Sequence, residues 1–430
     1  MIKRITIEKL FGLYDYDVVL SNEMNTTIIT GPNGYGKTTI LNIINHLHKS
    51  DFWYFYFLPF ELICVEYSSD DKITIKKRGK NKSNDSDDNN LNLDVEFIIN
   101  EDEKDCLLID GEYIRVNADY LRSYITNNTL FKAFTDEELF AKLYDINQDI
   151  ALRGMTNDII MFVNELPKSL FLSDNRIIAV NELKLLKTPI FSDETLKITD
   201  PVINLISNEL VACFSNANKI FAEESQLIDT SFLKNLDSEV KSYTKDEIVE
   251  IKKKAALYKE FGLFVGQDDF FEILEEKDIL GEHKFLALYL NNIEKKLSIY
   301  DELYARLKLL NDSILAINLS DKTVHFNKDK GIVVKNKNGV VVSLDKLSSG
   351  EQNIIILYFK LIFNTTKGSI LLIDEPETSL HMAWLSNMLD TYLKMAKTLE
   401  YQIVIATHSP AFISGEWDMT VDLYEITQNV

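Results

Sequence analysis

The chain has 430 residues, of which 46% are hydrophobic and 26% are charged, and its formal net charge is −21. This composition is typical of a soluble globular protein with one composite domain plus an insertion, or with two domains. The negative charge repels nucleic acid, so a DNA contact would need a local basic patch or a basic partner. Residues 76–82 and 252–254 are candidate patches, although runs this short are more often solvated faces.

The sequence contains no clear signal peptide, membrane span, disulfide framework or zinc-binding motif. Residues 1–10 alternate like a strand and lack the continuous apolar core of a signal peptide. The most apolar early run, residues 52–65, is interrupted by Pro59 and Glu61, and no run reaches the length of a membrane span. The three cysteines lie far apart without a C-x-x-C motif, which argues against a disulfide framework or a zinc site. We therefore expect a cytoplasmic protein without membrane contact.

The first chemical motif is the segment Gly31-Pro32-Asn33-Gly34-Tyr35-Gly36-Lys37-Thr38, which fits the phosphate-loop pattern G-x-x-x-x-G-K-[ST]. Residues 26–30 form a predicted buried strand before it, and residues 39–44 open an apolar-periodic helix after it, which is the context that the motif requires. We therefore predict a nucleotide site. Lys37 would contact the β- and γ-phosphates and the Thr38 hydroxyl would bind Mg²⁺. The other residues expected to bind the nucleotide are Asn33, Gly34, Gly36 and Thr39.

The next part of the chain is predicted to form antiparallel strands. Residues 62–67, 72–78 and 93–99 are rich in β-forming residues or alternate in polarity, with polar turn and loop clusters between them. A helical pattern follows over about residues 119–166, and residues 169–173 return to a strand pattern.

Long helices are predicted from about residue 201 to residue 319. Residues 282–311 are compatible with one helix, residues 239–261 with its antiparallel partner, and residues 262–266 with the break between them. Such a hairpin has two possible roles, plain scaffolding or contact with a dimer mate or partner. Three short strands with tight turns follow, over residues 323–326, 331–335 and 339–343.

The last quarter of the chain contains three further motifs. A signature segment, residues 347–352, precedes a helix over residues 353–363, and a plain helix N-cap is its alternative interpretation. Residues 370–375 form an apolar strand ending in Asp374, which would hold Mg²⁺, and Glu375, which would polarise the attacking water. Another buried strand, residues 402–406, leads to His408, which is either a γ-phosphate sensor or a hydrogen-bonded structural histidine.

The order of these motifs resembles that of the ABC-type ATPase heads of the SMC, Rad50, RecF and OLD group. The motifs are the phosphate loop, the signature segment, residues 370–375, the D-loop at residues 379–381 and the switch histidine His408. The resemblance covers residues 1–49 and about 340–415. It implies an α/β fold, an ABC-type phosphate-loop head with a mixed sheet and an antiparallel lobe, and an inserted helical hairpin or short coiled-coil arm. The expected domains are an N-terminal head lobe (1–200), the helical insertion (201–319) and a C-terminal head lobe (320–430).

The resemblance also implies a mechanism that uses ATP and Mg²⁺. Two heads would close on each other in a head-to-head dimer or a higher homo-oligomer, with Ser348 and Gly350 of one subunit contacting the γ-phosphate held by the other. Asp374 and Glu375 would keep the roles given above, and His408 would be the switch. Ser349 replaces the glycine usual in the signature. In the position of the Q-loop, Asn175 stands where the group has glutamine; its amide oxygen would bind Mg²⁺, unless this segment is a structural turn.

The features that are missing from the sequence narrow the expected function. The insertion is too short for the long coiled coil of a chromosome-maintenance protein, and no nuclease motif is recognisable elsewhere in the sequence. The chain most resembles the stand-alone ATPase subunits of bacterial anti-phage systems such as AriA of PARIS and PtuA of Septu. We therefore expect a regulatory ATPase that holds or releases a separately encoded effector, a nuclease. The alternative is a RecF-like DNA-repair ATPase that acts directly on DNA; a transporter-type subunit is disfavoured by the N-terminal phosphate loop and the helical insertion.

Overall fold

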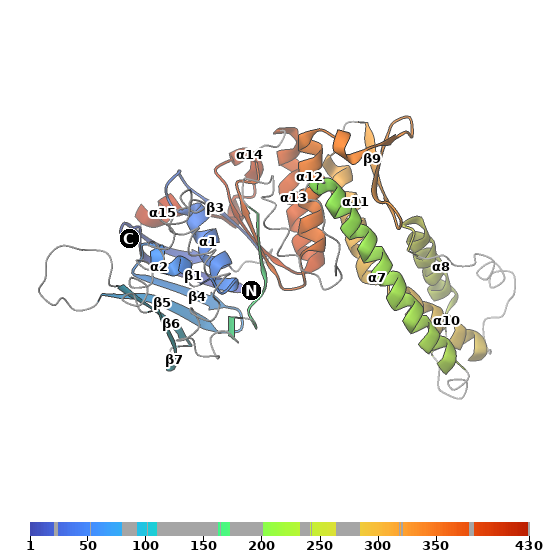
Figure 1. The fold of residues 1–430 in the computed structure, drawn as a ribbon, viewed down its shortest axis with the longest axis horizontal. Coiled ribbons are helices and arrows are strands. Elements are labelled where there is room, and N and C mark those ends of the chain that lie inside the picture. The colour runs from blue at the N-terminus through green and yellow to red at the C-terminus, as the bar shows by residue number, and fades with distance from the viewer. Residues whose placement is uncertain are drawn as a thin grey trace, which may run out of the picture. The chain divides into compact units, whose positions relative to one another are not determined.

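The protein divides into two compact units in the computed structural model (Figure 1). One unit contains Met1–Asp174 and Thr365–Val430, and the other contains Asn175–Asn364. The three domain boundaries expected from the sequence remain a prediction. The residues that the structure describes are 1–20, 25–51, 53–79, 93–100, 102–109, 162–163, 165–172, 201–232, 241, 243–263, 284–317, 319, 321–377 and 382–428.

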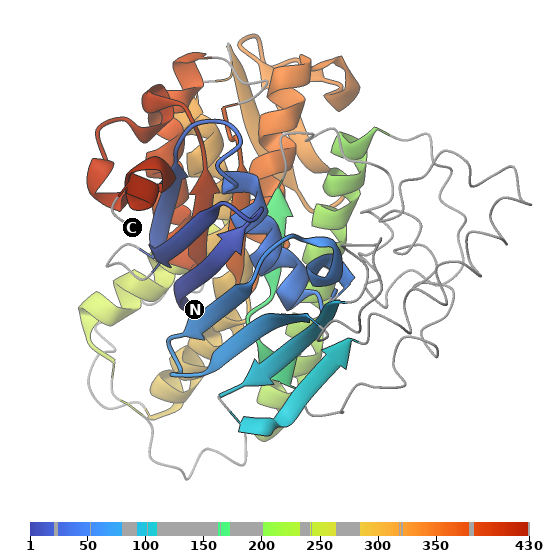
Figure 2. The ribbon, with the colours of Figure 1, turned by 90° about the vertical axis from the view of Figure 1, so that its left-hand side faces the viewer.

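The first unit contains a six-stranded antiparallel sheet in the order β2-β1-β4-β5-β6-β7, drawn in blue to cyan in Figure 2. Its strands are β1 (Ile2–Leu10), β2 (Tyr14–Val19), β4 (Leu62–Tyr67), β5 (Lys72–Gly79), β6 (Leu93–Ile99) and β7 (Asp102–Ile109). The buried residues of β1 are Ile2, Ile5, Ile7 and Leu10. Ile5 and Ile7 alternate as in a sheet with one buried face, and register shifts near both ends of the strand widen the spacing to three residues. The strands expected at residues 62–67, 72–78 and 93–99 are confirmed, whereas β7 was not predicted.

A five-stranded sheet in the same unit is entirely parallel, in the order β14-β3-β13-β12-β8. Its strands are β3 (Thr26–Thr30), β8 (Ser169–Leu172), β12 (Ile370–Asp374), β13 (Gln402–Ala406) and β14 (Thr420–Asp422). Every residue of β12 and β13 is buried, which explains their continuous apolar sequences. Parallel and antiparallel strands thus lie in separate sheets instead of one mixed sheet, and the expected α/β class with an antiparallel lobe is confirmed.

The core of the first unit joins both sheets around α1 (Lys37–His48). Side chains from β1, α1, β4 and β12 belong to one buried cluster. The buried amide of Gln402 links distant strands, since it accepts a hydrogen bond from the Ile2 N–H (2.8 Å) and donates to the carbonyl oxygens of Ile2 (2.8 Å) and Leu20 (3.1 Å). The remaining elements of this unit are α2 (Trp53–Phe57), α13 (Met382–Leu399), α14 (Pro410–Ile413), η4 (Trp417–Met419) and α15 (Leu423–Gln428). This core fixes the strand ends that carry the chemical motifs.

The described part of the second unit contains the helices α7 (Val202–Ser231), α8 (Lys245–Glu260), α10 (Lys284–Ser298) and α11 (Asp301–Ile317). The single helix expected over residues 282–311 is therefore wrong, because the chain turns between Ser298 and Asp301. The Ser298 hydroxyl donates to the Lys295 carbonyl oxygen there (2.7 Å), which competes with helical bonding. The turn also buries Tyr300, which stacks on Phe221 of α7 (ring centroids 5.2 Å apart).

The antiparallel partner of α10 and α11 is α7; α8 also contacts them, but the antiparallel direction expected for it is wrong. Along α7, Asn218 bonds Tyr300 (3.0 Å) and Asp229 bonds Lys296 (2.7 Å), so the two segments run in opposite directions. Tyr243, just before α8, bonds Glu294 (2.8 Å), and Tyr258 near its end bonds Asp301 (2.5 Å). The helix α8 therefore runs in the same direction as α10 and α11.

The described part of the second unit also contains a three-stranded antiparallel sheet, a short 3-10 helix and one further α-helix. They are β9 (Lys322–Asn327), β10 (Gly331–Asn336), β11 (Val341–Val342), η3 (Leu344–Lys346) and α12 (Ser349–Phe363), and the three expected strands are confirmed. Gly331 has a φ of 68°, and a Cβ there would lie 2.1 Å from the Ser207 carbonyl oxygen of α7. Only glycine fits this contact. Among the helices of the described residues, none combines the length and the apolar character needed to cross a membrane.

Candidate nucleotide site

The phosphate loop lies between β3 and α1, as the sequence predicted. Gly34 and Gly36 have φ values of 88° and 83°, the left-handed conformation that lets backbone N–H groups turn into a loop. The Lys37 ammonium donates to the carbonyl oxygens of Gly31 (2.8 Å) and Pro32 (3.3 Å). The Lys37 ammonium therefore stabilises the closed loop, and it is the same group that is expected to bind phosphate.

Asn33, Gly34 and Thr38 are exposed, and Thr39 and Gly36 are partly exposed. In α1, the first N–H groups point out of the helix N-terminus, and the N-cap Gly36 has no side chain to bond them. A phosphate group would satisfy these donors and the partial positive charge of the helix end.

The two residues expected to bind Mg²⁺ meet each other. The Thr38 hydroxyl donates a hydrogen bond to Asp374 Oδ1 over 3.1 Å, although 336 residues separate them in the chain. Asp374 is the last residue of β12 and is 6% exposed. A hydroxyl and a carboxylate oxygen side by side are the hard donors that Mg²⁺ prefers.

Glu375 and His408 also meet, because β12 and β13 are neighbouring parallel strands with Asp374 opposite Ala406. The Glu375 N–H donates to the Ala406 carbonyl oxygen (2.8 Å), and His408 Nδ1 lies 2.6 Å from Glu375 Oε2. Glu375 has a φ of 47°, a conformation that costs a non-glycine residue free energy and is common at functional sites. The His408 side chain is 59% exposed and open to a ligand.

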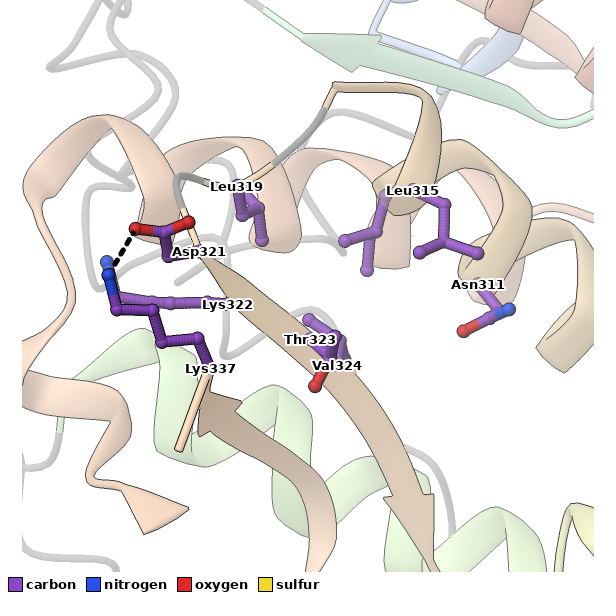
Figure 3. Close-up of a pocket in the computed structure, with 9 residues that line it drawn as sticks. Asn311, Leu315, Leu319, Asp321, Lys322, Thr323, Val324 and Lys337 are labelled. Carbon is purple, nitrogen blue, oxygen red and sulfur yellow. Dashed lines mark hydrogen bonds and ion pairs between the residues drawn. The ribbon is translucent and has the colours of Figure 1, made fainter. Parts of the chain in front are cut away.

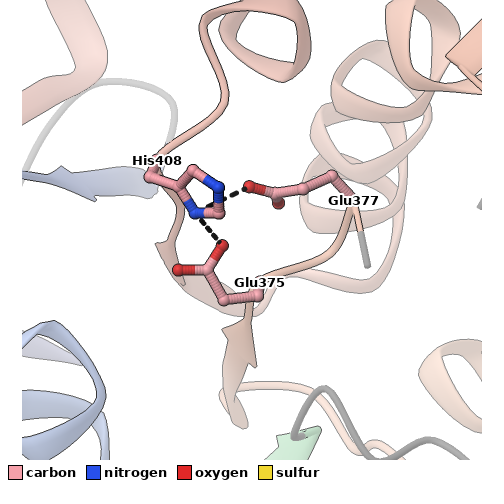
Figure 4. A group of neighbouring side chains, drawn as sticks. All are labelled: Glu375, Glu377 and His408. Carbon is pink, nitrogen blue, oxygen red and sulfur yellow. Dashed lines mark hydrogen bonds and ion pairs between the residues drawn. The ribbon is translucent and has the colours of Figure 1, made fainter. Parts of the chain in front are cut away.

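Glu377 is a third member of this group, and it is not among the residues expected from the sequence (Figure 4). Its Oε1 accepts a hydrogen bond from the Thr407 hydroxyl (2.5 Å) and lies 3.7 Å from His408 Nδ1. The signal available in the sequence is the spacing, a second glutamate two residues after Glu375. Its relevance depends on the register of β12 and β13, which the sequence does not reveal.

The electrostatics of this group centre on Glu375. Burial, together with the neighbouring Glu377 carboxylate, raises the pKa of Glu375 to about 7, and His408 opposes the change. A carboxyl group with a pKa near the working pH suits a general base.

The signature segment belongs to the second unit, and its serine is a helix N-cap. The Ser348 hydroxyl accepts a hydrogen bond from the Glu351 N–H (3.3 Å), and the Ser348 N–H donates to Glu351 Oε2 (2.9 Å). This capping box was the alternative interpretation of the segment. Ser348 itself is exposed, and Gly350 follows in the first turn of α12.

Glu351 is also paired with a lysine from β9, since Lys322 Nζ lies 2.6 Å from Glu351 Oε1. Burial alone would raise the pKa of Glu351, but the bonds from Lys322 and Ser348 hold that pKa below its usual value. Lys322 also lines a pocket beside α11, where Lys337 forms an exposed ion pair with Asp321 (3.4 Å, Figure 3).

Two sets of predicted site residues lie outside the residues that the structure describes. They are Asn175, the candidate Q-loop residue, and the D-loop at residues 379–381.

The phosphate loop follows a buried parallel strand, and a second strand of the same sheet ends in the carboxylate of Asp374. This combination defines a P-loop nucleotide-binding protein. Residues 1–413 match the AAA ATPase domain family, and the chain belongs to that family. Membership of an ATPase family implies the use of ATP.

Proteins similar to the chain include one curated relative and two solved structures. It is 24% identical over 431 residues to "Retron Vc95 probable ATPase" of Vibrio cholerae serotype O1 biovar El Tor, a match that covers 94% of this chain and 70% of that protein. A Pyrococcus furiosus Smc head domain with an extended coiled coil, bound to the C-terminal domain of ScpA, is 13% identical with a TM-score of 0.36. An SmcHead bound to the C-winged helix domain of ScpA is 10% identical with the same TM-score. Each of these two matches covers 96% of this chain and 91% of the solved one.

Proposed function

We propose that the protein is an ATP-hydrolysing regulatory subunit of a two-component bacterial anti-phage defence system. In this proposal an ABC-type, SMC-like head dimerises when it binds ATP, and the change holds or releases a separately encoded effector nuclease. The observation that carries the ATPase part is the meeting of Thr38 with Asp374, and of Glu375 with His408, at the ends of strands of one parallel sheet. Ligands of open α/β sheets bind outside such carboxyl ends.

Each residue of the group has a role in the proposed reaction. Lys37 exchanges the carbonyl oxygens of Gly31 and Pro32 for the β- and γ-phosphates, and the loop N–H groups bind the phosphate oxygens. Thr38 and Asp374 fit Mg²⁺, which would neutralise phosphate charge when bound. Glu375 orients and polarises the attacking water, and His408 holds the Glu375 carboxylate while it responds to the γ-phosphate.

The proposal of a regulatory subunit rests on different support. The Vibrio cholerae relative carries a name that links an ATPase to a retron. The net charge of −21 favours a basic protein partner over direct contact with DNA. ATP can drive such a switch only if the partner binds the two conformations of the head with different affinities. A shift of the conformations from 1:99 to 99:1 needs a difference in binding free energy of about 5.5 kcal/mol.

The nucleotide site is tested by calorimetric titration of the Lys37→Ala variant with MgATP. We expect the affinity to fall by about 1 to 2 orders of magnitude, because a charge-assisted contact to phosphate contributes roughly 1.5–3 kcal/mol, and the loop also loses the bonds by which Lys37 closes it. The exposed Lys367, which pairs with Glu400 away from the loop, supplies the control Lys367→Ala. Equal ATP affinity in Lys37→Ala and Lys367→Ala would contradict the site.

The composite dimer site is tested by mixing two inactive variants, Lys37→Ala and Ser348→Arg. If the signature segment of one subunit completes the site of the other, some mixed dimers contain one intact site and recover part of the ATPase activity. Lys37→Ala mixed with itself is the control. No recovery, with subunit exchange verified by a labelled subunit, would contradict the composite site.

The partner is tested by affinity capture of tagged Glu375→Gln from native cells, since this variant is expected to bind ATP and retain it. Capture of one stoichiometric basic nuclease, with an occupancy that differs between Glu375→Gln and Lys37→Ala, is the expected result. Capture of a homo-oligomer alone in both variants, together with salt-dependent binding of DNA by the purified protein, would instead favour the DNA-repair alternative.

A further inference from the structure

The carboxylate of Glu377 is only partly satisfied by the protein. Its side chain is 10% exposed, and its Oε2 is buried without a hydrogen-bond partner. The other oxygen, Oε1, bonds Thr407. A buried carboxylate oxygen without a partner carries a desolvation penalty, which a bound cation would remove.

This carboxylate points into a group that has the donors of a metal site. Glu375, Glu377 and His408 each offer one ligand atom, and these atoms lie within 4.8 Å of one another. His408 Nδ1 is 2.6 Å from Glu375 Oε2 and 3.7 Å from Glu377 Oε1. Two ligands of one tetrahedral zinc ion lie roughly 3.3 to 3.6 Å apart, given metal–ligand bonds of about 2.0–2.2 Å. The observed distances lie on either side of that range, so small side-chain movements would complete the site (Figure 4).

We propose that Glu375, Glu377 and His408 form a binding site for a divalent transition-metal ion, with Zn²⁺ as its best-fitting occupant, separate from the Mg²⁺ that accompanies ATP. One imidazole and two carboxylates suit Zn²⁺ better than Mg²⁺, which prefers oxygen donors alone. The proton that His408 Nδ1 shares with the Glu375 carboxylate is released to solvent when the ion binds, and Nδ1 then binds the ion through its lone pair. The exposed side of His408 leaves room for water to complete the coordination.

The site has a regulatory consequence, which rests on the proposed function. Glu375 is the group assigned to polarise the attacking water, and a metal ion bound to its carboxylate prevents that role. Zn²⁺ therefore inhibits ATP hydrolysis without occupying the phosphate loop, and it holds the head in a state that binds ATP but does not hydrolyse it.

The test is a titration of the full-length, tag-free and nucleotide-free protein with Zn²⁺ alone, followed by calorimetry. We expect one site whose affinity falls at least about tenfold in Glu377→Gln and in His408→Ala, since even indirect partners of a metal contribute that much. The control is His325→Ala, because His325 is an exposed histidine of β9, in the other unit. Thermal unfolding of each variant checks that it is folded, and Glu377→Gln is expected to remain so because it removes a crowded charge.

The outcomes separate this site from the nucleotide site. Lys37→Ala is expected to lose ATP binding and to keep Zn²⁺ binding, so a failed ATP assignment does not imply a failed metal site. The same Zn²⁺ affinity in wild type, Glu377→Gln and His408→Ala would overturn the proposal, as would the lack of Zn²⁺ binding by the wild type.

Discussion

Among the described residues, the carboxylate at the start of α12 and the two carboxylates after β12 differ in how fully the protein bonds them. At the start of α12, Glu351 is bonded by Lys322 and by the Ser348 N–H, and its pKa lies below the usual value. At the ends of β12 and β13, Glu375 and Glu377 share the single histidine His408, and Glu377 keeps an oxygen without a partner. The first group is complete and contributes stability. The second is incomplete and is suited to a ligand.

The two groups also differ in how the chain assembles them. Ser348 and Glu351 are three residues apart and meet through the geometry of one helix turn, and only their third partner, Lys322, comes from another element, 29 residues before Glu351. Glu375 and His408 are 33 residues apart and meet only through the register of two parallel strands. A stable local motif can therefore be recognised in the sequence, whereas a site built from several strands needs the fold.

The largest expected effect on stability comes from breaking the complete group with Lys322→Met. Glu351 then keeps a buried charge without its main partner, and we expect the free energy of unfolding to fall by about 2 kcal/mol. The loss is smaller than for a fully buried ion pair because the Lys322 side chain is 24% exposed. Chemical unfolding of the full chain measures the change.

Lys337→Met is the matched control for that substitution. Lys337 and Asp321 form an ion pair in the same region, with side chains 70% and 73% exposed, so no measurable change is expected. Equal destabilisation by both substitutions would show that the Lys322–Glu351 pair has no special part in stability.

A smaller change in stability is expected on lowering the pH. It comes from the buried His48, which belongs to neither carboxylate group. Burial, with a contribution from the N-terminal ammonium, lowers the pKa of His48 from 6.5 to about 3. Above pH 6.5 the residue is neutral in both states, and the stability is fully present. Between pH 6.5 and pH 3 the unfolded chain takes up a proton that the folded chain does not, so stability falls with pH.

At pH 5.5 this loss is about 1.4 kcal/mol relative to pH 8. The His48→Gln variant should show a shallower decline between pH 8 and pH 5.5 than the wild type in thermal unfolding, and the control His325→Gln should match the wild type. Equal declines in the wild type and His48→Gln would mean that the buried histidine does not govern this pH range.

The smallest stability effect is expected from Glu377→Gln in the incomplete group. Removing one of two neighbouring carboxylates relieves repulsion but alters the bond to Thr407, so the free energy of unfolding should stay the same or rise by less than about 1 kcal/mol. Thermal unfolding checks this, with Glu351→Gln as the destabilising counterpart. A loss in Glu377→Gln as large as that in Glu351→Gln would remove the distinction between the two groups.

Much of the local structure could be predicted from the sequence. The phosphate loop has fixed spacing, and the apolar runs of β12 and β13 indicate buried strands, so the sequence alone identifies Lys37, Thr38 and Asp374 as candidate site residues. The direction of α8 relative to α10 and the turn before Asp301 could not be predicted, because apolar spacing shows that a helix is amphipathic but not which neighbour covers it. Glu377 could not be predicted for the same reason, since its partners Thr407 and His408 follow another strand.

Catalysis by Glu375 at the ends of these parallel strands is tested by a single-turnover measurement of phosphate release from the Glu375→Gln variant, with ATP binding followed in the same sample. If Glu375 polarises the attacking water, the variant binds ATP nearly as well as the wild type and releases phosphate more slowly by about 10² to 10⁴. Phosphate release at the wild-type rate from Glu375→Gln would show that Glu375 has no such role.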